Sequence, residues 1–178
     1  MKVCRPVCED VPVEVRVARF ETPGGVVEQH VAITPTRAAD FAQQARWIEQ
    51  AARTTLAAMD CGNQTVVLRR LFCSDPANQM PLLAGSDLLE GGAVSVVGQP
   101  PMPPARIAVW SYHVGGRSDP PRILRANGSS ALRRGALTHH FCTGLGADRT
   151  EPADRQTTRL FADYERRLSE LGMNLADH

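Results

Sequence analysis

An excess of charge of either sign is missing from this 178-residue chain, in which 20 basic and 19 acidic residues leave a formal net charge of +1. A protein that binds nucleic acid needs an excess of lysine and arginine to neutralise phosphates. The balance therefore argues against a nucleic-acid partner. Apolar runs approaching the roughly 20 residues of a membrane-spanning helix are also missing, so we expect no membrane partner.

Cysteine is scarce and scattered, with an odd total of five residues at Cys4, Cys8, Cys61, Cys73 and Cys142. An odd, widely spaced set is not the pattern of a disulfide framework. The start of the chain also lacks the long apolar run of a secretion signal. We therefore expect reduced thiols and a cytoplasmic location, with Cys4 and Cys8 in a flexible N-terminal tail.

Metal and phosphate motifs are absent as well. His139, His140 and Cys142 lie within four positions, but on a strand they would point to alternating faces, and they lack the spacing of known zinc sites. The glycines of the run Thr143-Gly144-Leu145-Gly146 are not followed by the Lys-Ser/Thr of a phosphate loop, which favours a tight turn. We expect neither a metal nor a cofactor.

A nucleophile with its base is a further possibility, since Ser74, Asp75 and His113 are all present. The nucleophile-elbow motif is missing, and no pattern brings His113 near the other two. We favour a simpler interpretation, in which Asp75 or Ser74 caps the helix that follows.

Two strands are predicted near the start of the chain. Val11 to Phe20 alternates valine with mostly polar residues, the period-two pattern of a strand with one buried face. Thr22-Pro23-Gly24-Gly25 has the chemistry of a turn, and Val26 to Ile33 is predicted to be the returning strand. The two strands should form a hairpin.

A long helix is predicted next. Thr34 can cap it and Pro35 suits its first position, while Gly62 is expected to end it. Apolar residues recur at spacings of three and four, which places them on one helical face. They are Phe41, Ala45, Ile48, Ala52, Leu56 and Met59.

Further strands follow this helix. Val66 to Cys73 is apolar except at Arg69 and Arg70, so it should be central in its sheet. Asp75-Pro76 can start a short second helix. The runs 93–97 and 106–110 are predicted to be a strand pair that ends near His113. This order of elements favours an α+β domain with one long helix on one face of a mostly antiparallel sheet.

The glycine- and proline-rich segment 115–122 breaks the pattern and is our predicted linker. It separates a domain at 1–114 from a partial domain at 123–178. The second part should hold strands at Ile123-Leu124 and Leu137 to Thr143, then a helix from Pro152 to Leu171 that Gly172 ends. Two strands alone are marginal in water, so we expect this part to dock on the first domain, pair with another chain, or belong to a longer protein.

Two stretches of the chain resemble a known family. Gln99-Pro100-Pro101, between the strands 93–97 and 106–110, is similar to the late part of the Rid family, the RidA or YjgF imine and enamine deaminases. This family was formerly labelled endoribonuclease L-PSP or translation initiation inhibitor. The run 141–147 with the helix 152–172 resembles the opening half of a second Rid domain. The chain thus looks like the front of a tandem Rid protein, and it is also reminiscent of chorismatases.

The resemblance implies a chorismate-mutase-like α+β fold, a trimer or pseudo-trimer, and ligand pockets between neighbouring domains. It implies hydrolysis of reactive enamines and imines without a metal or cofactor. In such a site an arginine clamps the substrate carboxylate through paired, charge-assisted hydrogen bonds, while an activated water attacks the imine carbon.

The same resemblance supplies the candidate site residues. Gln99 stands at the arginine position and carries no charge, Trp110 falls near the position of an acidic residue, and Thr143-Gly144 replaces Ser-Gly while keeping a hydroxyl. We take Gln99, Trp110, Thr143 and Gly144 as the candidate residues for binding a small carboxylated ligand, and assign no catalytic residue.

The resemblance leads to three candidate functions. The first is a Rid-like hydrolase of imines, or a protein acting on a small carboxylated metabolite, at a domain interface. The second is a non-catalytic module that completes a trimeric or pseudo-trimeric assembly, with Trp110, Ala108 and Tyr112 on one strand face at the subunit contact. The third, an RNA-cleaving or translation-inhibiting protein, fits the balanced charge least well.

Overall fold

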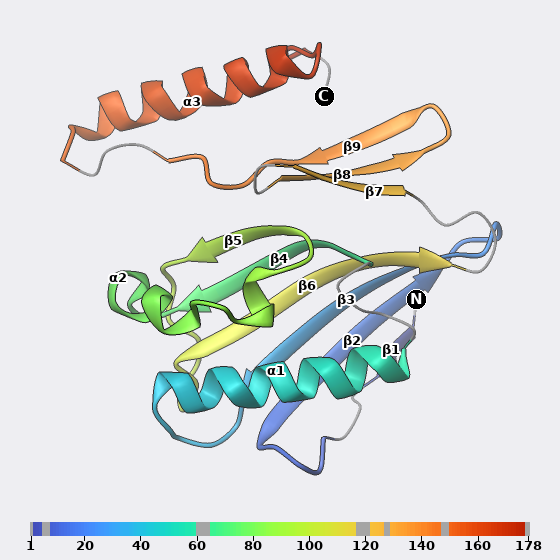
Figure 1. Ribbon diagram of the computed structural model, residues 1–178, viewed down its shortest axis with the longest axis vertical. Helices are drawn as coiled ribbons and strands as arrows, with labels where there is room; N and C mark the ends of the chain where they lie inside the picture. The colour runs from blue at the N-terminus through green and yellow to red at the C-terminus, as the bar shows by residue number, and fades with distance from the viewer. Residues whose placement is uncertain are drawn as a thin grey trace. The chain divides into compact units, whose positions relative to one another are not determined.

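The computed structural model describes residues 2–4, 8–59, 65–116, 122–126, 129–146 and 150–176. It divides into two compact units, Met1–Thr143 and Gly144–His178. The first unit contains a six-stranded sheet in the order β1-β2-β3-β6-β4-β5 (Figure 1). Its strands are β1 Lys2–Cys4, β2 Val13–Glu21, β3 Val26–Pro35, β4 Val66–Cys73, β5 Ala93–Val97 and β6 Ile107–Gly116.

All strand pairs of this sheet are antiparallel except β4 with β5, which run parallel. Parallel neighbours need a crossover connection. Here it is built from the short helix α2, Pro76–Gln79, and two 3₁₀ turns, η1 Met80–Leu83 and η2 Asp87–Leu89. Asp75 caps α2 as predicted, its carboxylate accepting from the Asn78 backbone N–H at 3.4 Å.

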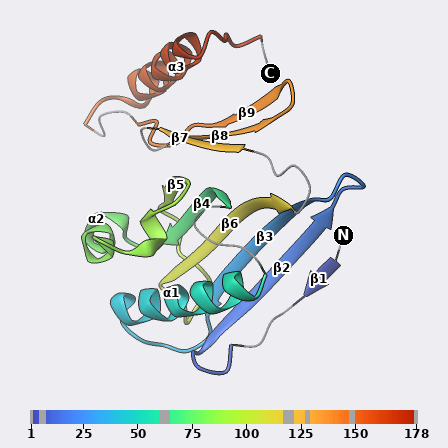
Figure 2. The ribbon, with the colours of Figure 1, turned by 45° about the vertical axis from the view of Figure 1, so that its right-hand side comes forward.

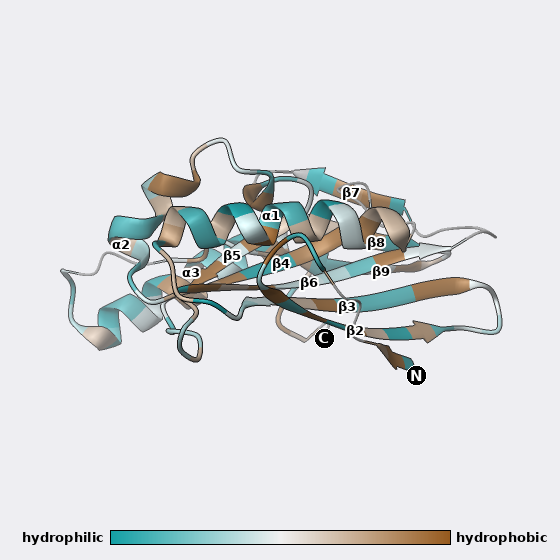
Figure 3. Cartoon of the chain, turned by 90° about the horizontal axis from the view of Figure 1, so that it is seen from below, coloured by the Kyte–Doolittle hydropathy of each residue, from teal (hydrophilic) through white to brown (hydrophobic). Residues whose placement is uncertain are grey.

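The long helix α1, Phe41–Ala58, lies along one face of this sheet (Figure 2). Polar and apolar residues alternate along it, as expected of an amphipathic helix (Figure 3). The apolar residues that α1 and the strands bury between them include Ile48, Leu71 and Ile107, all almost inaccessible to solvent. The predicted α+β domain with one long helix on one sheet face is therefore confirmed.

The start of α1 differs from the prediction. Thr34 and Pro35 belong to β3, where they lie opposite Glu14 and Val13 of β2, so neither begins the helix. Continued pairing with β2 satisfies the backbone there better than a helix cap would. Asp40 is the cap instead, accepting from the Gln43 N–H at 2.7 Å. The predicted end at Gly62 lies outside the described residues.

A second, three-stranded antiparallel sheet completes the first unit, in the order β7-β8-β9. Its strands are β7 Arg122–Ala126, β8 Ser129–Arg134 and β9 Leu137–Phe141. The middle strand β8 was not predicted, because its polar sequence has no clear apolar alternation. β1 was missed too: Cys4 lies in a strand paired with β2, and not in a flexible tail.

The second unit contains the helix α3, Ala153–Glu170, close to the predicted range. Gly172 follows it with a φ of 70°, and the Met173 N–H donates to the Leu168 carbonyl at 2.8 Å, which satisfies the helix end as predicted. Of the residues of α3 only Leu168 is buried, while Leu160 and Phe161 are exposed. Among the described residues, no helix is long and apolar enough to cross a membrane.

The boundary between the two compact units falls after Thr143. Residues 117–121 of the predicted linker 115–122 lie outside the described residues, and the linker stays a prediction. Whether 123–178 begins a second domain stays a prediction.

One buried side chain ties α1 to the sheet. The Gln44 amide donates to the carbonyls of Arg37 and Pro104 at 3.0 and 3.1 Å, and its carbonyl accepts from the Arg106 N–H at 2.7 Å. Gln44 is fully buried. These three bonds join the segment before α1, the helix itself and the start of β6.

We predict that Gln44→Leu lowers the free energy of unfolding by about 3 kcal/mol, because three backbone groups lose the hydrogen bonds that they make with this buried amide. Urea denaturation measures the loss. Gln50→Leu, at an exposed position of the same helix, is the matched control and should change stability by no more than about 0.5 kcal/mol. Equal stability of the two variants would contradict the role of Gln44.

Candidate functional site

The face of the six-stranded sheet opposite α1, here called the outer face, carries the polar and aromatic side chains that packing does not require. Successive side chains on a strand point to opposite faces. Since Val31 of β3, Leu71 of β4 and Val109 of β6 join the core beneath α1, their immediate neighbours face away from the helix. The outer-face residues of interest are Glu28, His30, Arg70, Trp110 and Tyr112.

Three of these residues form a stack of rings. The His30 ring stacks with Trp110, at a centroid distance of 5.6 Å and an interplanar angle of 20°, and with Tyr112, at 4.9 Å and 15°. The sheet register explains the arrangement, because His30 pairs directly with Tyr112 across β3 and β6. Side chains directly opposite each other in a sheet are close enough for such contacts.

A cation lies on the other side of the indole. The Arg70 guanidinium carbon is 5.7 Å from the centroid of the Trp110 ring, within the range of a cation–π contact. Arg70 pairs with Trp110 on β6 and with Ser95 on β5. Its side chain is exposed, so the charge is accessible to a ligand.

Tyr112 is held by its hydroxyl, which donates to the Glu28 carboxylate at 3.1 Å. Burial, and then the neighbouring Glu28 charge, raise the pKa of Tyr112 well above its usual range. The phenol therefore stays protonated at any physiological pH, and it remains a donor that fixes the position of Glu28.

The second sheet covers one end of the outer face. Val26, Val67 and Val114 form a buried cluster there, against which Ile123, Leu132 and Phe141 pack. The Ser130 hydroxyl donates to the Val67 carbonyl, and the Arg125 guanidinium donates to the Val66 carbonyl at 3.2 Å. Phe141 also contacts Tyr112, with ring centroids 6.1 Å apart. The outer face is thus closed beyond Tyr112.

The remainder of the outer face is accessible. His30 and Arg70 are exposed and Trp110 is half-buried. On the neighbouring strand β2, Phe20 is 49% exposed. This accessible surface therefore presents one exposed guanidinium and one exposed imidazole, the groups that can contact an anionic ligand.

The four residues predicted from the sequence lie in different places. Trp110 is at the centre of the outer face, while Gln99 is exposed in the loop between β5 and β6. In the described part of the chain, no hydrogen bond or ion pair links Gln99 to Trp110. Thr143 follows β9 two positions after Phe141, whose ring contacts Tyr112. The fold therefore brings the chain segment of Thr143 toward that of Trp110.

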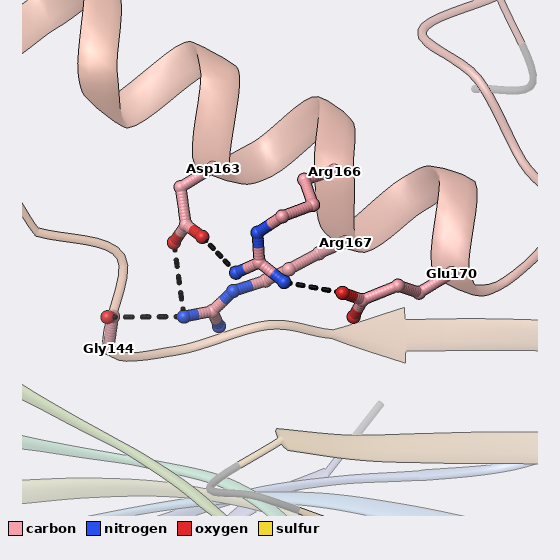
Figure 4. A network of polar contacts seen from close by, with 5 residues as sticks. All are labelled: Gly144, Asp163, Arg166, Arg167 and Glu170. Carbon is pink, nitrogen blue, oxygen red and sulfur yellow. Dashed lines mark hydrogen bonds and ion pairs between the residues drawn. The ribbon is translucent and has the colours of Figure 1, made fainter.

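Gly144 is the first residue of the second unit and has a φ of 70°. Its carbonyl accepts from the Arg167 guanidinium at 3.4 Å (Figure 4). Arg167 also pairs with Asp163 at 3.2 Å, and Arg166 joins Asp163 to Glu170. Hydrogen bonding from Arg166 lowers the pKa of Asp163. These exposed contacts tie the segment before α3 to the helix, and they give Gly144 a structural role.

A second group of polar residues lies on the opposite face of the sheet and is buried. Arg69 donates to the carbonyls of Asp87 and Glu90 at 2.7 and 2.8 Å, and so fixes the η2 turn that leads into β5. His113 lies between two hydroxyls, with Nε2 2.9 Å from Ser111 Oγ and Nδ1 3.2 Å from Thr65 Oγ1. All of its polar contacts are therefore internal.

The candidate nucleophile group is not assembled. The Ser74 hydroxyl accepts from the amide of Gln79 at 2.9 Å, and Asp75 caps α2. His113 is paired with Ser111 and Thr65 instead. The capping role predicted for Asp75 is therefore confirmed. Within the described residues, no group of three histidine, cysteine, aspartate or glutamate side chains is placed to hold a metal.

His30 and Arg70 were missed as site residues. The sequence shows Arg69 and Arg70 as polar exceptions in an apolar strand, but it does not show which of the two faces the helix. The strand order, with β6 between β3 and β4, is what brings His30 and Arg70 to the two sides of Trp110. The signal present in the sequence was that Arg69 and Arg70 are neighbours in a predicted strand, so one of the two must face away from the helix.

Comparisons with known proteins bear on the fold. No family model and no curated protein matches the chain. Among solved structures, it is similar to a candidate translation initiation inhibitor from Salmonella typhimurium, with 15% identity and a TM-score of 0.44 over 62% of this chain and 96% of that one. It is similar to NMB1025, a YjgF-family protein from Neisseria meningitidis, with 16% identity and a TM-score of 0.45 over 57% and 96%.

Yeast Mmf1 gives 14% identity and a TM-score of 0.40 over 64% of this chain and 94% of its own. Likeness at this level concerns the fold alone. The described elements agree with the fold predicted for a Rid/YjgF-like chain, a mixed sheet with one long helix on one face.

Buried His113 should make the free energy of unfolding depend on pH. Burial, and then the charge of Arg69, lower the pKa of His113 from 6.5 to about 4. The unfolded chain therefore binds this proton more readily than the folded chain. The stability that neutral His113 provides is complete above about pH 6.5 and is lost as the pH falls toward 4. Between pH 7.5 and pH 5 this group alone should cost about 2 kcal/mol.

We predict that His113→Gln flattens the pH dependence of unfolding by this amount. Urea denaturation at both pH values measures it. His139→Gln, at an exposed position, is the control and should keep the full dependence of the parent chain. A His113→Gln variant that still loses as much stability as the parent would show that the buried imidazole is not the acid-sensitive group.

Proposed function

We propose that this chain is a Rid-like protein that binds a small carboxylated metabolite on the open part of its outer face, and that it hydrolyses reactive imines or enamines there. The observation that carries the proposal is the exposed Arg70 guanidinium over the Trp110 ring. Arg70 supplies the positive charge that Gln99 lacks. The free thiols of the described cysteines support the proposed cytoplasmic location.

The chemistry of these residues suits an imine of a 2-oxo acid. A guanidinium binds a carboxylate through paired, charge-assisted hydrogen bonds. The neighbouring Ser95, opposite Arg70 on β5, provides a hydroxyl at the same place. The half-buried Trp110 side chain beside the guanidinium offers apolar contact to the remainder of the ligand. Hydrolysis adds water across the C=N bond and releases ammonia and the 2-oxo acid.

We predict that the parent chain releases ammonia from an enzymatically generated imino acid faster than buffer does, and that Arg70→Gln removes most of this rate. Loss of a charge-assisted pair should weaken binding of 2-oxobutanoate, a product analogue, by about 10- to 100-fold. Ammonia assay and calorimetric titration measure the two effects.

Arg53→Gln is the matched control, because Arg53 is an exposed arginine on α1. It should leave rate and binding unchanged. A parent chain with no rate above buffer would reject hydrolysis, and an Arg70→Gln variant that binds 2-oxobutanoate normally would reject the ligand site.

The alternative is a non-catalytic module that completes a trimeric or pseudo-trimeric Rid assembly. One observation favours it: the order β7-β8-β9-α3 repeats the order β1-β2-β3-α1, with three adjacent antiparallel strands followed by an 18-residue helix in both. This repeat supports the proposal that 123–178 begins a second domain. The second sheet already packs on part of the outer face, and another sheet would cover the part around Trp110.

In that case we predict that Trp110→Ala lowers the mass seen by sedimentation, because the indole is the largest apolar group on the open surface. Leu82→Ala is the control, since Leu82 is 58% exposed in the η1 turn. Unchanged mass and stability of Trp110→Ala would remove the assembly role.

A further inference from the structure

His30 is an exposed residue of the outer face that is not part of the buried core. Its ring is exposed, yet it is held nearly parallel to the rings of Trp110 and Tyr112. In the described part of the chain, no hydrogen bond engages its ring nitrogens. The imidazole is thus oriented by stacking while both nitrogens stay open to a ligand or to water.

The strand order places His30 and Arg70 on opposite sides of one ring. β6 lies between β3 and β4, so the strands of His30 and Arg70 are two interstrand spacings apart, on the order of 10 Å. A carboxylate held by Arg70 puts the adjoining imine carbon above Trp110. One water molecule then fits between that carbon and His30, since each hydrogen-bonded or attacking contact spans roughly 3 Å.

We propose that His30 is the general base of imine hydrolysis at this site, an assignment that rests on the proposed function. Neutral imidazole accepts a proton from water as the water oxygen bonds to the imine carbon. The C=N electron pair moves to nitrogen, which takes that proton from the imidazolium and leaves His30 neutral again. His30 next accepts the hydroxyl proton as the C–N bond breaks, and ammonia leaves with a proton returned by the imidazolium. Imine and water become 2-oxo acid and ammonia.

Charged and titratable groups lie around His30 on its own strand and on the neighbouring strands. Glu28 lies on the same strand, Tyr112 on β6, Arg70 on β4 and Arg16 on β2, where Arg16 is paired with Glu14 at 2.9 Å. A protonated imidazole cannot accept a proton from water. The rate should therefore fall on the acid side, and a variant without the imidazole should lack this acid limb.

The test compares His30→Gln with the parent chain and with His139→Gln, which removes an exposed histidine from β9. Loss of a general base should lower kcat for ammonia release by about 100-fold or more. Calorimetric affinity for 2-oxobutanoate should stay within about twofold, because Arg70 still holds the carboxylate. His139→Gln should match the parent in both.

The outcomes separate the two proposals. If the parent is active and His30→Gln retains both its rate and its acid limb, His30 is not the base while the proposed function stands. If His30→Gln loses rate and affinity together, the residue is a binding group, and its assignment as the base is wrong. If the parent releases no ammonia above buffer, the proposed hydrolysis fails and the assignment fails with it.

Discussion

Burial of α1 against the six-stranded sheet is the constraint on which the remaining structure depends. Ile48 of the helix and Leu71 and Ile107 of the strands are almost inaccessible to solvent, and their burial fixes which face of every strand points inward. A shift of one residue in any strand would turn its apolar set toward water. The positions of His30, Arg70 and Trp110 on the outer face follow from that same choice, so core packing and the candidate site are specified together.

The neighbouring residues Arg69 and Arg70 show how sharply this constraint separates structural from functional roles. Arg69 points to the opposite face of the sheet, where its guanidinium is buried and donates to the carbonyls of Asp87 and Glu90. Arg70 points outward, where its charge remains accessible beside Trp110. The same division applies to His113 and His30: one imidazole is buried between two hydroxyls, and the other is stacked and open. Residue type alone does not tell which arginine, or which histidine, has the structural role and which is accessible to a ligand.

The sequence was sufficient for elements with a strong periodic signal and insufficient for contacts between them. The apolar spacing of three and four predicted α1, and apolar content predicted β4 and β5 at the observed bounds. Thr34 was misassigned because its local chemistry suits a helix cap, whereas pairing with Glu14 of β2 holds it in a strand. The stack around Trp110 depends on β6 lying between β3 and β4, which no local pattern encodes.

Arg70 also limits what can cover the open part of the outer face. Burying the Trp110 side chain is favourable, at about 25 cal/mol for each square ångström of apolar surface removed from water. Burying the adjacent guanidinium without a partner costs several kcal/mol, which cancels much of that gain. A second sheet that covers Trp110 must therefore bring hydrogen-bond acceptors to Arg70, either a carboxylate, as a metabolite would, or backbone carbonyls like those that bind Arg69. The ligand site and the assembly surface thus impose the same chemical requirement, acceptors placed at this one guanidinium.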